Sequence, residues 1–205
     1  MTPDIRKSNI AGSWYPGTPK ALRSQIQAFL KAVPGLPEVT GELMALIVPH
    51  AGYAYSGGVA AYAYKLLTVQ PFTQVVIIAP SHRYPFKGAS IDGKDGYETP
   101  LGVVPVDQVL AQAIAEKSPV FKYVPEGHAQ EHSLEIQLPF LQESLKEFSM
   151  VPIIQGSQDP STCEEIARVL AMVLKGKKVL LLASTDLSHF HPYEQAKKLD
   201  KKILD

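Results

Sequence analysis

The chain is poor in cysteine, in net charge and in long apolar runs, and each shortage excludes a class of protein. Cys163 is the one cysteine among 205 residues, so no disulfide can form within the chain and a reducing, cytoplasmic location is expected. Basic and acidic residues number 20 each, so no overall charge attracts nucleic acid or an anionic membrane. No apolar run approaches the roughly 18 residues of a membrane span, and no secretory signal is visible.

Motifs of several common enzyme classes are absent as well. The chain contains no G-x-x-x-x-G-K-[S/T] loop, no G-x-G-x-x-G turn and no G-x-S-x-G elbow. The sequence therefore argues against a P-loop nucleotidase, a dinucleotide-binding enzyme and a serine hydrolase. Cys163 is not a candidate nucleophile, because Glu164 and Glu165 beside it oppose the fall in thiol pKa that a helix start can cause.

What the sequence does contain is a series of short apolar runs separated by helical patterns. The runs do not alternate with polar residues, which is typical of strands buried on both faces of a parallel sheet. They lie at residues 43–48, 74–79, 150–154 and 178–183. The sequence predicts a single α/β domain with a mostly parallel central sheet flanked by helices, and a hairpin or irregular edge over residues 88–106.

Histidine motifs follow three of the four predicted strands. A P-H pair ends the first, a P-S-H motif the second, and an S-T-D-L-S-H motif the last, and these motifs supply His50, His82, Asp186 and His189. Ligands of open parallel sheets bind outside the carboxyl ends of the strands. A lone histidine in such a place is usually a loop residue, but three equivalent ones predict a site at one rim of the sheet.

Further residues are candidates for the same site. Glu131 and His132 are expected to open an amphipathic helix, with Glu135 three residues after His132 on the same face. These side chains either join the site, or they only cap the helix or lie on its outer face. His128 and His191 are expected to face solvent.

The stretch PHAGYAYSGG, residues 49–58, is predicted to form a glycine turn, with Ser56 capping a helix that begins near Gly58. Tyr55 then flanks the first histidine, where it either lines the pocket or only packs against neighbouring side chains. Trp14, in the N-terminal motif GSWYPG, either covers the cleft as a lid or fastens the N-terminus to the core.

Clustered imidazoles suit zinc, copper or iron. Two histidines and one carboxylate would favour ferrous iron and oxygen chemistry, whereas three histidines would also suit a hydrolytic zinc ion. Without a metal, the histidines and Asp186 would act as acid–base groups or anion binders.

Seven motifs in order resemble the Memo-like family, protein B of the AmmeMemoRadiSam set. They are AGSWY, PHAGYAYSG, PSH, Y-x-TPLG, EHSLEIQLPFL, VPIIQG and STDLSH. The resemblance implies a fold shared with class III extradiol ring-cleaving dioxygenases. It also implies a cleft with His50, His82 and a late cysteine, and His189 in the same cleft.

The late cysteine has no counterpart, because Cys163 precedes STDLSH. The single domain, residues 1–205, is therefore expected to lack its C-terminal segment, which leaves the third metal ligand unsupplied. The last predicted helix, which starts near Pro192, agrees with this expectation because it reaches Asp205 without a capping residue.

The leading hypothesis is a redox-type metal site, and whether it performs dioxygenase-like oxidation is left open. His50 and His82 would bind iron or copper, His189 and Asp186 would act beside the metal, and a small-molecule or peptide ligand would meet Trp14, Tyr55, His132 and Glu135. One alternative is a non-enzymatic module that holds a peptide or small anion in the same cleft. The other is a zinc-dependent hydrolase.

Overall fold

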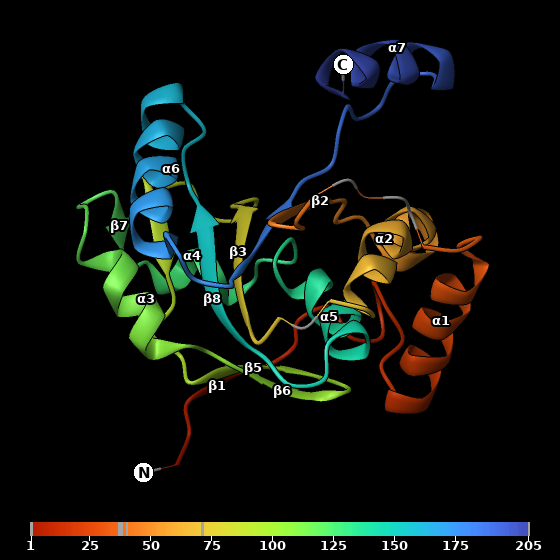
Figure 1. Cartoon of the computed structure of the whole chain (residues 1–205), viewed down its shortest axis with the longest axis horizontal. Helices are drawn as coiled ribbons and strands as arrows, with labels where there is room; N and C mark the ends of the chain where they lie inside the picture. The colour runs from red at the N-terminus through yellow and green to blue at the C-terminus, as the bar shows by residue number, and fades with distance from the viewer. Residues whose placement is uncertain (1, 37–38, 40, 71, 205) are drawn as a thin grey trace.

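The computed structural model describes residues 2–36, 39, 41–70 and 72–204, and its centre is a six-stranded sheet (Figure 1). The strand order is β2 (Ala45–Val48), β9 (Leu180–Ser184), β3 (Gln74–Pro80), β8 (Ser149–Gln155), β4 (Ala89–Ile91) and β7 (Phe121–Lys122). The first four strands are parallel, β4 runs antiparallel to β8, and β7 is parallel to β4. The four predicted strands and their parallel arrangement are confirmed.

The central strands carry apolar side chains on both faces because helices cover both faces. In β3, Val75 and Ile77 face one apolar cluster, whereas Val76 faces the other. Strand β2 departs from the expected two-sided burial, because Leu46 and Val48 are buried while Ile47 is 73% exposed. The C-terminal ends of the parallel strands therefore meet at one rim, above a core that is packed on both sides of β3.

A second, three-stranded sheet holds the N-terminal segment. It contains β1 (Ile5–Arg6), β5 (Gly96–Thr99) and β6 (Gly102–Pro105). Strands β5 and β6 form an antiparallel hairpin within the predicted hairpin region. Gly102, at the turn, has a φ of +122°, a backbone conformation that residues other than glycine rarely adopt. Because β1 pairs with β5, the residues that follow β1 are directed toward the centre of the molecule.

Two groups of helices lie on opposite sides of the central sheet (Figure 1). One group contains α1 (Pro19–Ala32), α2 (Tyr53–Leu67) and α5 (Leu138–Ser144), and the other contains α3 (Gln108–Ala115) and α6 (Pro160–Leu174). Short α4 (Pro125–Ala129) lies near β4, and α7 (Tyr193–Leu204) extends away from the layers. No helix in the described part of the chain combines the length and apolarity that a membrane crossing requires.

Helix α2 begins earlier than predicted. Its N-cap is Gly52 and its first residue is Tyr53, so Gly57 and Gly58 lie inside the helix rather than in a turn. Ser56 does not cap a helix; its hydroxyl donates a hydrogen bond to the carbonyl of Ala51 at 2.9 Å. A Cβ on Gly57 would come within 2.6 Å of the Phe29 ring, so this glycine permits close packing of α2 against α1.

The segment after residue 130 is not one helix, as the sequence analysis expected. A 3-10 turn covers Glu135–Gln137, and α5 begins at Leu138 with Pro139 in its first turn. Proline lacks an N–H group and is therefore tolerated at a helix start but not in its interior. His132 thus lies ahead of the helical segment, and the predicted shared helical face with Glu135 does not form.

Candidate metal centre

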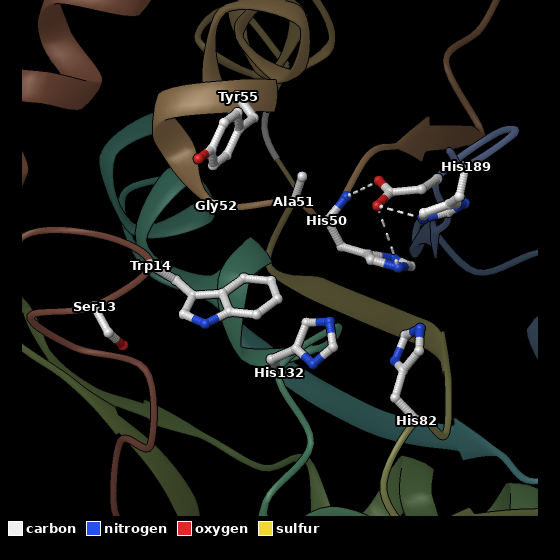
Figure 2. A pocket seen from close by; sticks show the side chains of 10 residues that line it. Ser13, Trp14, His50, Ala51, Gly52, Tyr55, His82, His132 and His189 are labelled. Carbon is white, nitrogen blue, oxygen red and sulfur yellow. Dashed lines mark hydrogen bonds and ion pairs between the residues drawn. The ribbon is translucent and has the colours of Figure 1, made fainter. Parts of the chain in front are cut away.

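Three histidines from three separate segments meet at the carboxyl rim of the sheet (Figure 2). His50 follows β2, His82 follows β3, and His132 lies just before the 3-10 turn. Their potential ligand nitrogens all lie within 4.8 Å of one another. The ring centroids are 5.2 Å apart for His50 and His82, and 4.5 Å apart for His82 and His132. This spacing allows one ion to contact all three rings.

His132 reaches the rim because its neighbours are bound to the end of β3. The hydroxyl of Ser133 donates to the carbonyl of Pro80 at 2.8 Å, and a carboxylate oxygen of Glu131 accepts the backbone N–H of His82. These contacts join residues about 50 positions apart in the sequence. The third imidazole of the cluster is therefore supplied by a crossing segment and not by a strand end.

A closed hydrogen-bond network determines the tautomer of His50. The Ser184 hydroxyl donates its one proton to the carbonyl of Ser133 at 2.6 Å, and it accepts the Gln137 side-chain amide at 2.8 Å. It lies 3.1 Å from Nδ1 of His50, and since its proton is already used, Nδ1–H must be the donor. Nε2 of His50 consequently keeps a free lone pair. Burial lowers the pKa of His50, despite the nearby Asp186 carboxylate, and this favours the neutral ring.

His82 is oriented in the same way by Glu131. Nδ1 of His82 lies 2.9 Å from Oε1 of Glu131, a carboxylate that is 1% exposed and also accepts the backbone N–H groups of His132 and Ser133. Burial alone would raise the pKa of Glu131, but these donors hold it at about 2. The carboxylate is therefore ionised and accepts the Nδ1 proton, so Nε2 is the ring nitrogen of His82 that is available to a metal.

His132 is the ring whose hydrogen bonding is incomplete. Its Nδ1 is buried and makes no hydrogen bond with the described residues, although Oε1 of Glu131 lies 3.3 Å away. Burial lowers the pKa of His132 to about 4, so the ring is neutral near pH 7. The cluster thus contains two buried rings with lowered pKa values, His50 and His132, and a third ring held at Nδ1 by Glu131, and such a set of imidazoles fits a transition-metal ion.

Asp186 and His189 line the same cavity as the cluster, and Figure 2 shows His189 beside His50. Asp186 accepts the backbone N–H of His50 at 2.7 Å. Its Oδ2 lies 3.8 Å from Nε2 of His50 and 3.5 Å from Nε2 of His189. The His189 side chain is 58% exposed, so it connects the carboxylate with solvent.

A cavity of about 390 Å³ lies in front of the cluster, and Trp14, Tyr55, Asp186 and His189 line it with the three histidines. The Trp14 ring packs on His132 with a centroid separation of 4.2 Å. The carbonyl of Trp14 also accepts the backbone N–H of Tyr53 at 2.9 Å, which is the first residue of α2. Trp14 thus packs on His132 in the cavity wall, and its backbone fastens the N-terminal segment to α2.

Comparison with known proteins agrees with this arrangement. The model of the Memo-like protein family matches residues 6–205. MEMO1 family proteins of Methanothermobacter thermautotrophicus and Methanococcoides burtonii are 36% and 37% identical, over 98% of this chain and 76% and 74% of their own lengths. The chain belongs to the Memo-like protein family.

The Memo-like fold has a counterpart among solved structures. A crystal structure of an uncharacterized Escherichia coli K12 protein superposes with a TM-score of 0.51 at 20% sequence identity. The match covers 73% of this chain and 62% of the other, so the chain spans less than two thirds of that neighbour. At this identity the similarity shows the fold alone, which is the expected α/β class.

Glu135 was a candidate for contact with a ligand, but in this Memo-like chain it lies away from the cavity. It is 0% exposed, and its carboxylate accepts Nη1 of Arg6 at 2.7 Å, the Ser8 hydroxyl at 2.6 Å and the Tyr15 hydroxyl at 2.8 Å. It also accepts the backbone N–H groups of Asn9 and Ile10. Glu135 therefore anchors the N-terminal segment that carries Trp14, and it does not line the cavity.

The expectation that His128 faces solvent is wrong. Its side chain is buried, with Nδ1 2.8 Å from the Tyr97 hydroxyl and Nε2 3.1 Å from the Ser90 hydroxyl. Burial lowers the pKa of His128 to about 4. His191 is exposed, as predicted. Sequence reasoning also missed Ser184 and Gln137, since nothing in a serine or glutamine marks it as the partner of a distant histidine.

Proposed function

We propose that this Memo-like chain binds a redox metal ion, iron(II) or copper, through ring nitrogens of His50, His82 and His132. The observation that carries the proposal is their grouping within 4.8 Å, with Nδ1 of His50 held by Ser184 and Nδ1 of His82 held by Glu131, so that Nε2 of each ring is available to a metal. His132 takes the place of the third ligand that the late family cysteine would supply.

The surrounding charges suit a divalent cation. The carboxylate of Glu131 contacts the ring nitrogen of His82, and that of Asp186 lies 3.8 Å from Nε2 of His50. Two carboxylates next to the imidazoles offset the two positive charges of such an ion at short range. Iron or copper bound there would supply one-electron chemistry toward oxygen or an organic ligand.

The other side chains that line the cavity orient the histidines, exclude water and admit a ligand. The carboxylate of Asp186 lies between His50 and the exposed His189, where it can orient either ring. Trp14 excludes water from one side of His132. A small ligand would enter past the exposed Tyr55. The single cysteine supports a reducing, cytoplasmic setting, in which iron(II) is maintained.

A metal titration of protein purified without oxygen and without an affinity tag tests the proposal. Iron(II), copper and zinc are titrated by calorimetry and by the fluorescence of Trp14, the one tryptophan of the chain. His50→Ala, His82→Ala and His132→Ala are each expected to lower the affinity at least 100-fold, because loss of an outer partner alone costs about 10–100-fold. His191→Ala, at an exposed histidine, is the matched control.

Each outcome has a defined meaning. Tight binding of iron or copper that depends on all three histidines supports the proposal. Zinc binding without affinity for iron or copper would favour the hydrolase, since three histidines with an open position also suit catalytic zinc. Equal binding by all variants, or no binding near neutral pH, would overturn the metal site and leave a binding module that uses the same cavity.

A further inference from the structure

A second cavity adjoins the proposed metal site and contains a basic residue. It has a volume of about 410 Å³ and shares Ser13, Trp14 and His132 with the first cavity. Its remaining lining includes Arg83, Asn9 and Gln130, and no carboxylate. The two cavities therefore share Trp14 and His132 in their walls, with the histidine cluster lining one cavity and a guanidinium lining the other.

Arg83 differs from the other three arginines of the chain. Arg6 pairs with Glu135, Arg23 with Glu143, and Arg168 with Glu165. Arg83 makes no hydrogen bond or ion pair with any residue that the structure describes, and its side chain is exposed at the mouth of the second cavity. An arginine that lines a cavity without a carboxylate partner is available to a ligand.

Charge balance points in the same direction. The carboxylates of Glu131 and Asp186 lie next to the histidine cluster, and together they offset a divalent ion. Among the described residues that line the two cavities, Arg83 then carries the one positive charge without a counterpart. A ligand with a single negative charge would restore neutrality, whereas a cationic ligand would increase the imbalance.

We infer that the two adjacent cavities together bind a small organic monocarboxylate, with its carboxylate on Arg83 and its apolar body across Trp14 toward the histidine cluster. A guanidinium matches a carboxylate through two parallel N–H···O bonds. Trp14 borders both cavities and Tyr55 lines the first, so a flat apolar body has aromatic surface to pack on. This inference rests on the proposed metal site, because it sets the reacting end of the ligand beside the metal.

The test is a titration of the metal-loaded protein with benzoate, followed by Trp14 fluorescence and calorimetry. Benzamide has the same shape without the charge. We expect Arg83→Ala to weaken benzoate binding roughly 10-fold or more, the range for a lost hydrogen bond to a charged group. The affinity for benzamide and for the metal should stay within about threefold of wild type, since Arg83 lies outside the cluster. Lys87→Ala is the control, because it removes an exposed positive charge four residues away that lines neither cavity.

The outcomes separate this inference from the metal proposal. Benzoate binding that falls in Arg83→Ala but not in Lys87→Ala supports the inference, with or without bound metal. Equal benzoate binding by wild type and Arg83→Ala, or no benzoate binding by a protein that holds its metal, would overturn it. Failure of the wild-type protein to bind metal would overturn only the proposed function.

Discussion

The Ser184 hydroxyl accepts the Nδ1 proton of His50, and this one contact leaves Nε2 of His50 free to face the cavity. The arrangement depends on Gln137, whose side-chain amide donates both to Ser184 and to the carbonyl of Pro49 at 3.0 Å. Its oxygen accepts the Tyr64 hydroxyl at 2.6 Å. The tautomer of a candidate metal ligand is therefore set by a chain of buried polar groups that extends into α2.

Removal of the hydroxyl should weaken metal binding while the ligands stay in place. We expect Ser184→Ala to lower the affinity about 10–100-fold, because the His50 ring loses its orienting acceptor. Metal titration measures the effect. Ser188→Ala, at an exposed serine four residues later, should bind metal as wild type does. Unchanged affinity in Ser184→Ala would show that the His50 ring is held by packing alone.

Glu131→Gln should weaken both the fold and the metal site. The two oxygens of Glu131 accept the His82 ring and the backbone N–H groups of His82, His132 and Ser133. An amide NH₂ in place of one oxygen would face a donor with a donor. We expect a loss of about 1–3 kcal/mol in unfolding free energy, the usual cost of an unsatisfied buried group. We also expect metal affinity to fall about 10–100-fold.

Urea unfolding and metal titration of the same samples measure the two effects of Glu131→Gln. Glu126→Gln is the matched control, because Glu126 is exposed and lies five residues earlier in the chain. If Glu131→Gln matched this control in both measurements, Glu131 would have no part in orienting the histidines.

Stability of the metal-free protein should fall as the pH drops below about 6.5. Burial lowers the pKa of His128 to about 4 in the folded protein, compared with about 6.5 in an unfolded chain. Between these values the unfolded chain binds a proton that the folded chain does not. The unfolding free energy therefore decreases with falling pH, by up to about 1.4 kcal/mol per pH unit for such a histidine.

Urea unfolding between pH 4.5 and 7.5 measures this dependence. The slope should be smaller in His128→Gln, which cannot titrate, and unchanged in His191→Gln, at an exposed histidine. Identical slopes in wild type and His128→Gln would mean that His128 titrates equally in the folded and unfolded chain.

Glu135→Ala should be strongly destabilising. Arg6 is 6% exposed, and its Nη1 would lose its ion-pair partner. Removal of one partner of a buried pair typically costs about 3–5 kcal/mol. Glu98→Ala provides the comparison, because the Lys7–Glu98 pair is exposed and such pairs contribute about 0–1 kcal/mol. Equal losses, measured by urea unfolding, would contradict the anchoring role of Glu135.

The strand pattern and the rim of histidines could be predicted because both follow from local sequence. Apolar runs report burial, and parallel strands place their carboxyl ends together whatever the rest of the chain does. His50, His82 and His189 were therefore assigned to one rim without knowledge of any contact. The positions of α2 and of residues 131–137 were not predictable in this way. In the sequence, a glycine pair in a turn cannot be distinguished from a glycine pair inside a tightly packed helix. Gly57 belongs to the second kind, because it lets α2 pack closely against Phe29.

The placement of His132 and of His128 depends on contacts between distant segments. His132 enters the cluster because Glu131 and Ser133 bind the end of β3, which no spacing in the sequence reveals. His128 is buried because Tyr97 and Ser90 close around it, although its neighbours glycine and alanine gave no sign of burial. In both cases the partners lie at least 30 positions away.

The contact between the Trp14 carbonyl and the Tyr53 N–H has a kinetic consequence. Helix α2 has no side-chain cap, and this carbonyl accepts one of the N–H groups that the first turn leaves without a helical partner. Displacement of the Trp14 backbone would leave that group unpaired. The backbone that carries the indole is thus fixed, and the exposed Tyr55 and His189 border the open side of the cavity. Association should proceed at the rate of a preformed site, without a slow opening step.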